Sequence, residues 1–374
     1  MSGIYLHIPF CRRACHYCDF HFSTSFKTYD GVVESILKEL EHWSAAWHAP
    51  IQTIYFGGGT PSTLTKEDLG KILSVIREKF EVEPAAEITL EANPEDIHPS
   101  LLQAWKELGV NRLSMGVQSF FEDELLWMNR NHSAEKSKTS VKQAQDAGFE
   151  NITIDLMYGL PVSSSTRWQE NVESAIALNV PHLSAYALTV EERTALYHQI
   201  KKGELREPSE EEAHDQFIFL RRALLNAGFE HYEISNFAKP GWRSVHNGNY
   251  WNGVPYLGIG PGAHGYDGDV RRMNIANNAQ YVNLIKREES WFETELLSVQ
   301  DRFNELTMTH LRKAEGISLE EVQVRFGDDY KKHLMESAQS AIDKGWLEWK
   351  GDRLTLTEDG IFFADGITVD LMEA

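Results

Sequence analysis

The stretch IYLHIPFCRRACHYCDF, residues 4–20, joins a short apolar run to a cysteine-rich loop. All three cysteines of the chain lie in it: Cys11, Cys15 and Cys18. The spacing C-x3-C-x2-C places the three thiolates on one tight loop, which can wrap a compact metal centre. Two centres fit: zinc with His16 or His21 as its fourth ligand, or an iron–sulfur cube with one iron that no protein thiolate holds. Cysteines without a shared role would be scattered along the chain.

Outward from this stretch, the chain alternates short β-rich runs with longer amphipathic ones. Strands are expected at residues 4–8, 53–57, 87–92, 112–117, 151–158 and 182–188. Helices are expected near residues 28–47, 65–80, 98–108, 134–147, 166–178 and 210–227. The strand runs are apolar almost throughout, as parallel strands buried on both faces are. Successive βα units predict a parallel sheet covered by helices, either doubly wound or curved into an incomplete barrel.

A polar or glycine-rich element follows each of these strands. The elements are GGGTPS at 57–62, Glu91, Gln118, Asp155 with YGLP after it, and SAYALT at the sixth strand. Barrel enzymes build their sites on loops at the carboxyl ends of the strands, and all these elements fall on that one face. We therefore expect an α/β fold with a partial (β/α)6 barrel. Simpler explanations exist for each element alone: a turn before a helix, a helix-capping carboxylate, or, for Arg130, a surface charge.

The composition restricts the partners and the compartment. The chain has 374 residues and a formal net charge of −20, so it repels phosphate backbones and anionic lipid. No apolar run approaches the roughly 18 residues of a membrane span. The start MSGIYLHIPF lacks the pattern of a secretory signal. We expect a cytoplasmic protein without nucleic-acid binding or membrane insertion, in which clustered cysteines serve a metal or catalysis and not disulfides.

The second half of the chain lacks the βα rhythm. Residues 235–280 are rich in Asn, Gly and Trp and show little periodicity. From about residue 298 the pattern predicts three helices and then a hairpin within GWLEWKGDRLTLTEDG (345–360), the order of a winged-helix-like module. Because it has no basic stripe, we expect this module to serve packing and not DNA binding. The expected parts are a barrel, a linking region and a helical, winged-helix-like domain: residues 1–230, 231–297 and 298–374.

The cysteine stretch resembles the C-x3-C-x2-C signature of the radical S-adenosylmethionine (SAM) enzymes. The resemblance implies a [4Fe–4S] cluster held by the three cysteines, with the amino and carboxylate groups of SAM on the fourth iron. It also implies that an electron from the reduced cluster cleaves SAM to methionine and a 5′-deoxyadenosyl radical. Phe20 stands at the position of a possible fourth cysteine, and the resemblance implies that no fourth cysteine is needed because SAM binds the fourth iron.

From Tyr5 to the winged-helix-like tail, the order of the motifs is similar to that of the radical SAM group built around the oxygen-independent coproporphyrinogen III oxidase. This resemblance implies that five residues contact SAM near the cluster: Tyr5, Gly58, Gly59, Thr60 and Glu91. It implies that Tyr17 meets the adenine. Three further positions match SAM contacts, which in the oxidase help to hold a second SAM: Gln118, Arg130 and Asp155.

Two departures argue against the oxidase reaction. The oxidase pattern ends in a fourth cysteine where this chain has Phe20, and the oxidase has a long segment where only ten residues precede Cys11. HNGNYW (246–251) instead resembles the H-N-x-x-Y-W pattern of a sister group of heme chaperones. That resemblance implies transfer of heme to acceptor proteins; the alternative is oxidative decarboxylation of coproporphyrinogen III. The implied partners are heme, heme-accepting apo-proteins and an electron donor for the cluster, and a homodimer is left open.

The HNGNYW segment has the chemistry that heme needs. A neutral imidazole is a good axial ligand for heme iron, and Tyr250 and Trp251 offer flat apolar faces to a porphyrin. The Asn–Gly–Asn centre predicts a turn that presents His246 outward, although a plain turn anchored by its aromatic residues has the same pattern. His264, in the glycine-rich GIGPGAHGY (258–266), is expected in a tight loop near the barrel mouth.

Overall fold

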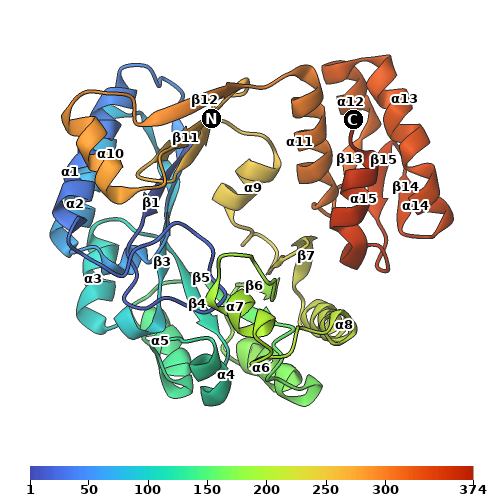
Figure 1. The fold of residues 1–374 in the computed structure, drawn as a ribbon, viewed down its shortest axis with the longest axis horizontal. Helices are drawn as coiled ribbons and strands as arrows, with labels where there is room; N and C mark the ends of the chain where they lie inside the picture. The colour runs from blue at the N-terminus through green and yellow to red at the C-terminus, as the bar shows by residue number, and fades with distance from the viewer. Residues whose placement is uncertain (374) are drawn as a thin grey trace.

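Six parallel strands in chain order form the centre of the computed structural model, which describes residues 1–373. They are β1 (Ser2–Ile8), β2 (Ile51–Gly58), β3 (Val82–Ala92), β4 (Arg112–Gln118), β5 (Asn151–Tyr158) and β6 (His182–Ala187). Each strand pairs in parallel with the next, and their apolar side chains share one core with the surrounding helices. The curved sheet with helices outside is a partial (β/α)6 barrel, which confirms the expected fold class (Figure 1).

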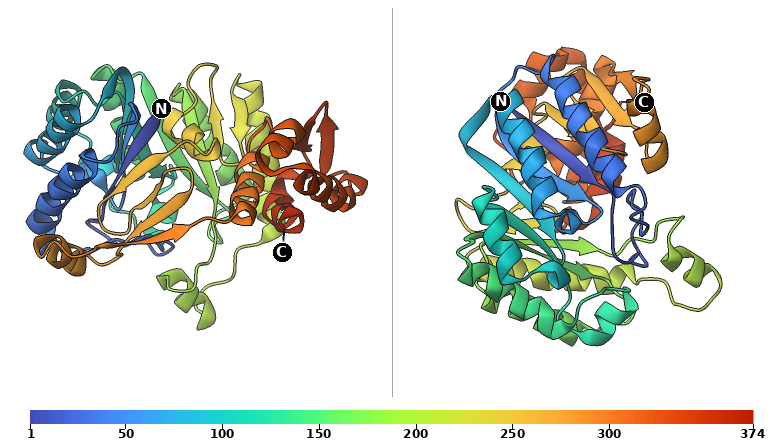
Figure 2. Two further views of the ribbon diagram at one scale, coloured as in Figure 1. Left: turned by 90° about the horizontal axis from the view of Figure 1, so that it is seen from above. Right: turned by 90° about the vertical axis from the view of Figure 1, so that its left-hand side faces the viewer.

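Amphipathic helices cover the outer face of the barrel (Figure 2). They are α1 (Tyr29–Ser44), α2 (Lys66–Lys79), α3 (Pro99–Glu107), α5 (Ala134–Asp146), α6 (Ser165–Ala177) and α8 (Glu210–Asn226). In α2 the inward side chains Leu69, Leu73 and Ile76 recur every three to four residues, and Thr65 caps its first turn by accepting the N–H of Asp68. Two shorter helices, α4 (Glu122–Trp127) and α7 (Ala195–Lys201), follow β4 and β6.

The sheet continues beyond both ends of this parallel set. Past β1 lie β9 (Tyr256–Ile259), β10 (His264–Tyr266), β11 (Val270–Asn274) and β12 (Phe292–Leu296); past β6 lie β8 (Asn236–Ala238) and β7 (Glu230–Glu233). Helices α9 (Val245–Trp251) and α10 (Asn278–Lys286) interrupt these strands. The sequence predicts little regular structure for residues 235–280, and the structure corrects that prediction. The added strands have three to five residues, too few to show a period.

A buried carboxylate ties α1 to the strands added beyond β1. Glu39 is 0% exposed and accepts hydrogen bonds from the backbone N–H of Gly260 (2.8 Å), the amide of Asn274 (2.7 Å), the hydroxyl of Tyr281 (2.5 Å) and the indole N–H of Trp291 (2.9 Å). These donors lie 221 to 252 residues further along the chain. One acidic side chain thus holds the added strands against the barrel.

The last part of the chain folds around its own apolar cluster, which spans Phe303 to Leu371. Its helices are α11 (Val299–Leu311), α12 (Leu319–Phe326), α13 (Asp328–Ser337), α14 (Gln339–Asp343) and α15 (Ala364–Leu371). Strands β14 (Leu347–Lys350) and β15 (Arg353–Leu356) form the hairpin expected within 345–360, and β13 (Ile317–Ser318) pairs with β15. The hairpin lies where the sequence predicts it, but four helices and β13 precede it instead of the three helices expected, and α15 follows it. Within residues 1–373, no helix has the length and apolar character needed to cross a membrane.

Candidate functional site

The cysteine loop leaves β1 at the carboxyl end of the barrel and is held there by contacts that do not involve the thiols. The backbone N–H of Cys11 donates to the carbonyl of Ser23 (3.0 Å). The side-chain amide of Asn129 donates to the carbonyl of Ala14 (2.7 Å). All three cysteines are free and partly buried. The loop is therefore preformed with its thiols available.

Each of the two histidines considered as a fourth zinc ligand has one ring nitrogen engaged by another group. The Nδ1 of His16 donates to the carbonyl of Trp127 (2.7 Å), and the Nε2 of His21 lies 2.8 Å from the side-chain oxygen of Asn278. In the described chain, no three His, Cys, Asp or Glu side chains converge as on a single metal ion. A cube distributes its thiolates over different irons, so three thiols that do not converge on one point fit an iron–sulfur centre.

A continuous hydrogen-bonded chain connects two of the thiols through side chains from three different loops. The hydroxyl of Thr60 donates to the sulfur of Cys11 (3.3 Å), and the amide of Asn93 donates to the Thr60 oxygen (3.3 Å). Arg130 donates from Nη2 to the Asn93 oxygen (2.7 Å) and from Nη1 to the sulfur of Cys15 (3.4 Å). Donors on sulfur stabilise thiolates and tune the clusters that they hold.

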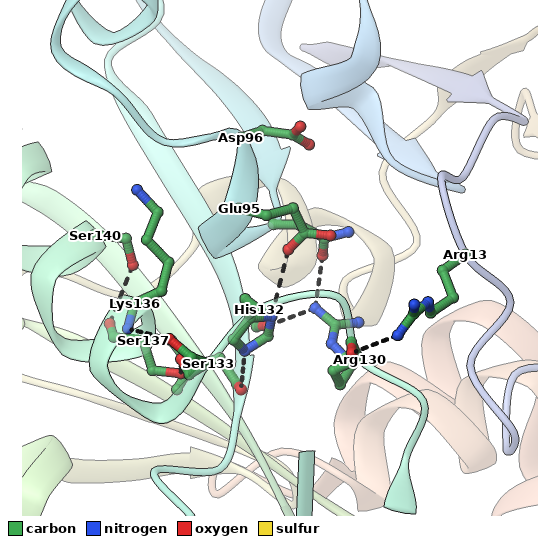
Figure 3. A network of polar contacts seen from close by, with 12 residues as sticks. Arg13, Glu95, Asp96, Arg130, His132, Ser133, Lys136, Ser137 and Ser140 are labelled. Atoms are coloured by element: carbon green, nitrogen blue, oxygen red, sulfur yellow. Dashed lines mark hydrogen bonds and ion pairs between the residues drawn. The ribbon is translucent and has the colours of Figure 1, made fainter. Parts of the chain in front are cut away.

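Arg130 is itself held in position, as Figure 3 shows. Its Nη2 also donates to the carbonyl of Gly116 (2.6 Å), while Arg13 donates to the Arg130 carbonyl (3.3 Å). Nearby, His132 lies 3.3 Å from Glu95 through its Nδ1 and donates from Nε2 to the carbonyl of Val117 (3.1 Å). Arg130 is therefore a fixed cation against the cysteine loop, and the interpretation as a mere surface charge is wrong.

Burial makes the thiols of Cys11 and Cys18 reluctant to ionise without a metal. It raises the pKa of Cys18 to about 12, and it is also the main reason that the pKa of Cys11 is raised. Metal binding requires thiolates, so it must release these protons. Assembly of a centre on this loop is thus expected to become more favourable as the pH rises.

The glycines of GGGTPS allow the end of β2 to pass close to β1. Gly58 has a φ of 104°, in the left-handed region, and a Cβ there would lie 2.6 Å from the ring of His7. A Cβ on Gly59 would lie 2.8 Å from the carbonyl oxygen of Ile8. Both glycines are required by the approach of the two strands, and they bring Thr60 to the cysteine loop.

Two carboxylates and an amide face the barrel interior near the carboxyl ends of β3, β4 and β5. Glu91 accepts a hydrogen bond from the hydroxyl of Tyr55 (2.7 Å), and burial raises its pKa to about 7. Burial likewise raises the pKa of Asp155 to about 6. Gln118 has a φ of 65°, and its buried side-chain oxygen has no partner within residues 1–373. Neither carboxylate caps a helix, because α6, which follows β5, is capped by Ser164 and α3 has no side-chain cap.

The raised pKa of Glu91 predicts a pH-dependent stability. Its folded-state pKa of about 7 exceeds the ordinary value of 4.5, so the stability linked to this group is lost as the pH rises from about 4.5 through 7. Glu91→Gln should remove that loss. In urea unfolding, the free energy of unfolding of the variant minus that of the wild type should increase by on the order of 1 kcal/mol from pH 5 to pH 8. The exposed Glu81→Gln is the control, and parallel pH profiles for wild type and Glu91→Gln would contradict the prediction.

Tyr5 lies on β1 and Tyr17 lies within the cysteine loop. Tyr5 stacks on Tyr55 inside the barrel, with ring centroids 6.1 Å apart, and its hydroxyl lies 3.3 Å from the Nδ1 of His7. Tyr17 packs against a small apolar cluster that includes Met128. Burial raises the pKa of the Tyr17 hydroxyl, and the neighbouring Cys15 raises it further. Both tyrosines therefore stay protonated and able to donate.

The HNGNYW segment is not the exposed turn that its sequence predicts. It forms helix α9, and His246 is only 2% exposed. Its Nδ1 lies 2.7 Å from the hydroxyl of Thr53, its Nε2 lies 3.0 Å from the hydroxyl of Tyr250, and its ring stacks on Tyr55 at 4.8 Å. Burial lowers the pKa of His246 to about 3, so the imidazole is neutral.

Helix α9 closes the end of the barrel opposite to the cysteine loop. Thr53 and Glu87 are neighbours in register near the amino end of β2. Glu87 accepts the backbone N–H groups of Val245 (3.1 Å) and His246 (3.0 Å), which fixes the first turn of α9. The predicted turn became a helix because this carboxylate and the cap by Ser244 satisfy its amino end. His264 is exposed at the start of β10, in a strand and not in a loop.

Comparison with known proteins agrees with this architecture. Residues 5–174 match the model of the radical SAM superfamily, and residues 297–363 match the HemN C-terminal domain. The chain is 34% identical to a protein named heme chaperone HemW from Lactococcus lactis subsp. lactis strain IL1403, over 98% of this chain and 96% of that protein. It is also 34% identical to the heme chaperone HemW of Bacillus subtilis strain 168, over 96% of each. The chain belongs to the HemW family of radical SAM proteins.

A solved structure shows the same fold at lower identity. The coproporphyrinogen III oxidase (HemN) of Escherichia coli, described as a radical SAM enzyme, superposes with a TM-score of 0.87 and 22% sequence identity. The alignment covers 99% of this chain and 90% of the oxidase chain. This chain therefore shares the fold of the oxidase, barrel and C-terminal helices included.

Membership of the radical SAM superfamily implies a [4Fe–4S] cluster and SAM, and the residues present fit both. Three free thiols share one loop, and the buried side-chain oxygen of Gln118 and the Nε of Arg130 lack partners within residues 1–373. Bound ligand atoms would satisfy such groups. The structure gathers the predicted cluster and SAM residues at the carboxyl end of the barrel. His246, Tyr250 and Trp251 lie on α9, where the ring of His246 stacks on the predicted SAM residue Tyr5 with centroids 6.4 Å apart.

Sequence reasoning missed two residues of this site, Asn93 and Tyr55. Asn93 joins Thr60 to Arg130, and Tyr55 joins Glu91 to His246. Asn93 follows Glu91 by two positions in LEANPE, so its place just beyond a strand was a usable signal. Tyr55 lies inside an apolar strand, and nothing in the sequence distinguishes it from a core residue.

Proposed function

We propose that the protein is a heme chaperone that carries a SAM-coordinated [4Fe–4S] cluster and transfers heme to acceptor proteins. The proposal is supported by the HemW relatives, which match nearly the whole chain. The observation that carries it is the HNGNYW segment, whose Tyr250 and Trp251 line a cavity outside the barrel while His246 packs inside. Family resemblance and an accessible aromatic surface thus coincide in one short helix.

In this proposal the carboxyl end of the barrel holds the cluster and SAM. Cys11, Cys15 and Cys18 would ligate three irons, which leaves the fourth for SAM. Contacts to SAM near the cluster are assigned to these residues: Tyr5, Tyr17, Gly58, Gly59, Thr60 and Glu91. Gln118, Arg130 and Asp155 contribute further SAM contacts. When bound, the reduced cluster supplies an electron to SAM, so an electron-donor protein in the cytoplasm is a required partner.

His246 can reach a heme iron only if α9 moves. Both ring nitrogens are engaged, with Thr53 and Tyr250, and the ring is stacked on Tyr55. Ligation by His246 therefore requires α9 to leave the end of the barrel and break its contacts with Glu87. Tyr250 and Trp251 need no such movement to meet a porphyrin, because both already line the cavity.

Oxidative decarboxylation of coproporphyrinogen III is the second candidate function. It is favoured by the joint position of Gln118, Arg130 and Asp155, which match SAM contacts of the oxidase. It is disfavoured by Phe20, which occupies the place of the oxidase's fourth cysteine and is 68% exposed. The Phe20 side chain therefore points mainly to solvent, where a partner can contact it, and does not line the interior of the barrel.

The proposed function predicts heme binding without oxidase activity. Titration followed at the Soret band should show about one heme per chain. Anaerobic incubation with SAM, a reductant and coproporphyrinogen III should give no protoporphyrinogen IX, and the protein should not rescue a strain that lacks the oxidase. Robust rescue would establish the second candidate, and absence of saturable heme binding would refute the first.

A further inference from the structure

A cavity of about 300 Å³ lies where α9, the strands added beyond β1 and α11 meet. Figure 1 shows α9 between the barrel and α11. Four aromatic side chains line the cavity: Tyr250, Trp251, Tyr256 and Tyr266. Its volume is at the lower limit of small-molecule sites, and Met308, also in the lining, is 42% exposed. A ligand larger than the cavity would therefore project into solvent from an aromatic-walled slot.

Three of the charged residues that line this slot are arginines, although the chain carries a net charge of −20. Arg271, Arg302 and Arg325 line it together with a single acidic residue, Glu305. Each arginine is held by a carboxylate: Arg271 by Glu305 (2.6 Å), Arg302 by Asp269 (2.5 Å) and Arg325 by Glu321 (2.9 Å). The Nε atoms of Arg271 and Arg302 are buried and lack an acceptor in residues 1–373. These two Nε–H groups are available to donate hydrogen bonds to the carboxylates of a ligand.

His310 adds a ligand for a metal to the same lining. Its Nδ1 donates to the carbonyl of Leu306 (3.2 Å), one turn earlier in α11, so the neutral ring keeps its lone pair on Nε2. The nearest carboxylate to Nε2 is that of Glu321, at 3.9 Å, which is too far for a hydrogen bond. Burial lowers the pKa of His310 to about 4, which keeps the ring neutral. A backbone bond on one nitrogen with the other free is the usual arrangement of metal-ligating histidines.

We propose that this cavity is a porphyrin site in which His310 ligates the iron, the aromatic side chains contact the macrocycle and the arginines hold its carboxylates. The ligand class is an iron porphyrin with peripheral carboxylates, so the inference rests on the proposed heme-chaperone function. It differs from ligation by His246 in the residue that binds the iron, which is His310 on α11. Helix α9 contributes Tyr250 and Trp251 and stays at the end of the barrel. Tyr250 contacts His246 on one side and the cavity on the other, and it separates His246 from the bound iron.

The iron ligand is tested by comparing heme with metal-free protoporphyrin IX. His310→Ala should weaken heme binding by roughly tenfold or more and shift the Soret band, but leave protoporphyrin IX affinity nearly unchanged. His310→Gln, which keeps a side chain of similar size, guards against loss of folding, and both variants should unfold near the wild-type temperature. His264→Ala, exposed and outside the cavity, is the control and should match wild type. An unchanged Soret band in both His310 variants, with a shifted one in His246→Ala, would overturn the inference.

The carboxylate contacts are tested by removing two of the cations. Arg302→Gln/Arg325→Gln should weaken heme and protoporphyrin IX alike, by roughly tenfold. The matched control is Lys331→Gln/Lys332→Gln on α13, which changes the net charge equally away from the cavity. Equal effects of both pairs would mean that only overall charge matters and would refute the site. If wild type binds no heme, the proposed function fails; if wild type binds heme and these cavity variants bind it normally, only this inference fails.

Discussion

Anaerobically purified protein in which Cys11, Cys15 and Cys18 are all replaced by alanine will be colourless, while the wild type will be brown with about four irons per chain. Each thiol is one of only three that the chain offers, and all are free on one preformed loop. Loss of these ligands should remove the whole cluster and not a part of it. Iron and zinc analysis together with the visible spectrum measures the effect.

The loop contacts of Ser23 and Asn129 do not involve thiols, so the cysteine-free variant should keep its fold. Thr60→Val is the matched control: it deletes the donor on Cys11 and should change the cluster's reduction potential but keep most of the iron. SAM should also perturb the EPR signal of the reduced wild-type cluster. The assignment of a cluster with one open iron would be contradicted if the protein contained zinc in place of iron or if the triple variant retained iron. An EPR signal that saturating SAM leaves unchanged would also contradict it.

Glu39→Ala should reduce the free energy of unfolding by about 3–5 kcal/mol, because each buried donor left without an acceptor costs about 1–3 kcal/mol before the structure relaxes. The substitution leaves four donors, from Gly260, Asn274, Tyr281 and Trp291, buried without their acceptor. Because these donors belong to the strands and helix added beyond β1, that region should become the first to exchange its amide hydrogens. Urea unfolding and hydrogen exchange measure the two effects.

Glu34→Ala is the control for this prediction, since Glu34 lies on the same helix but is exposed and should cost little. Glu39→Gln should fall between the two, because one amide oxygen remains to accept and the amide nitrogen faces other donors. Similar stabilities for the variants at positions 34 and 39 would show that the buried network does not anchor the added strands.

The barrel could be predicted from the sequence because its signals are local and repeated. The six parallel strands appear at the predicted places, with β5 (Asn151–Tyr158) matching at both ends, and each outer helix begins within two residues of its expected start. Continuous apolar runs followed by amphipathic stretches admit few arrangements other than parallel strands with helices outside. The cysteine spacing likewise carries its chemistry within eight residues, from Cys11 to Cys18.

Contacts between distant segments were decided only by the tertiary structure. The sequence of HNGNYW favours a turn, but Glu87, which lies 158 and 159 residues from the two amides that it accepts, stabilises a helix there and buries His246. The chain from Thr60 through Asn93 to Arg130 joins three loops, and the cavity at His310 joins α9 to α11. A local pattern determines which face of an element is apolar. It does not determine which distant donor, acceptor or ring meets that face, because the packing of the complete chain selects those partners.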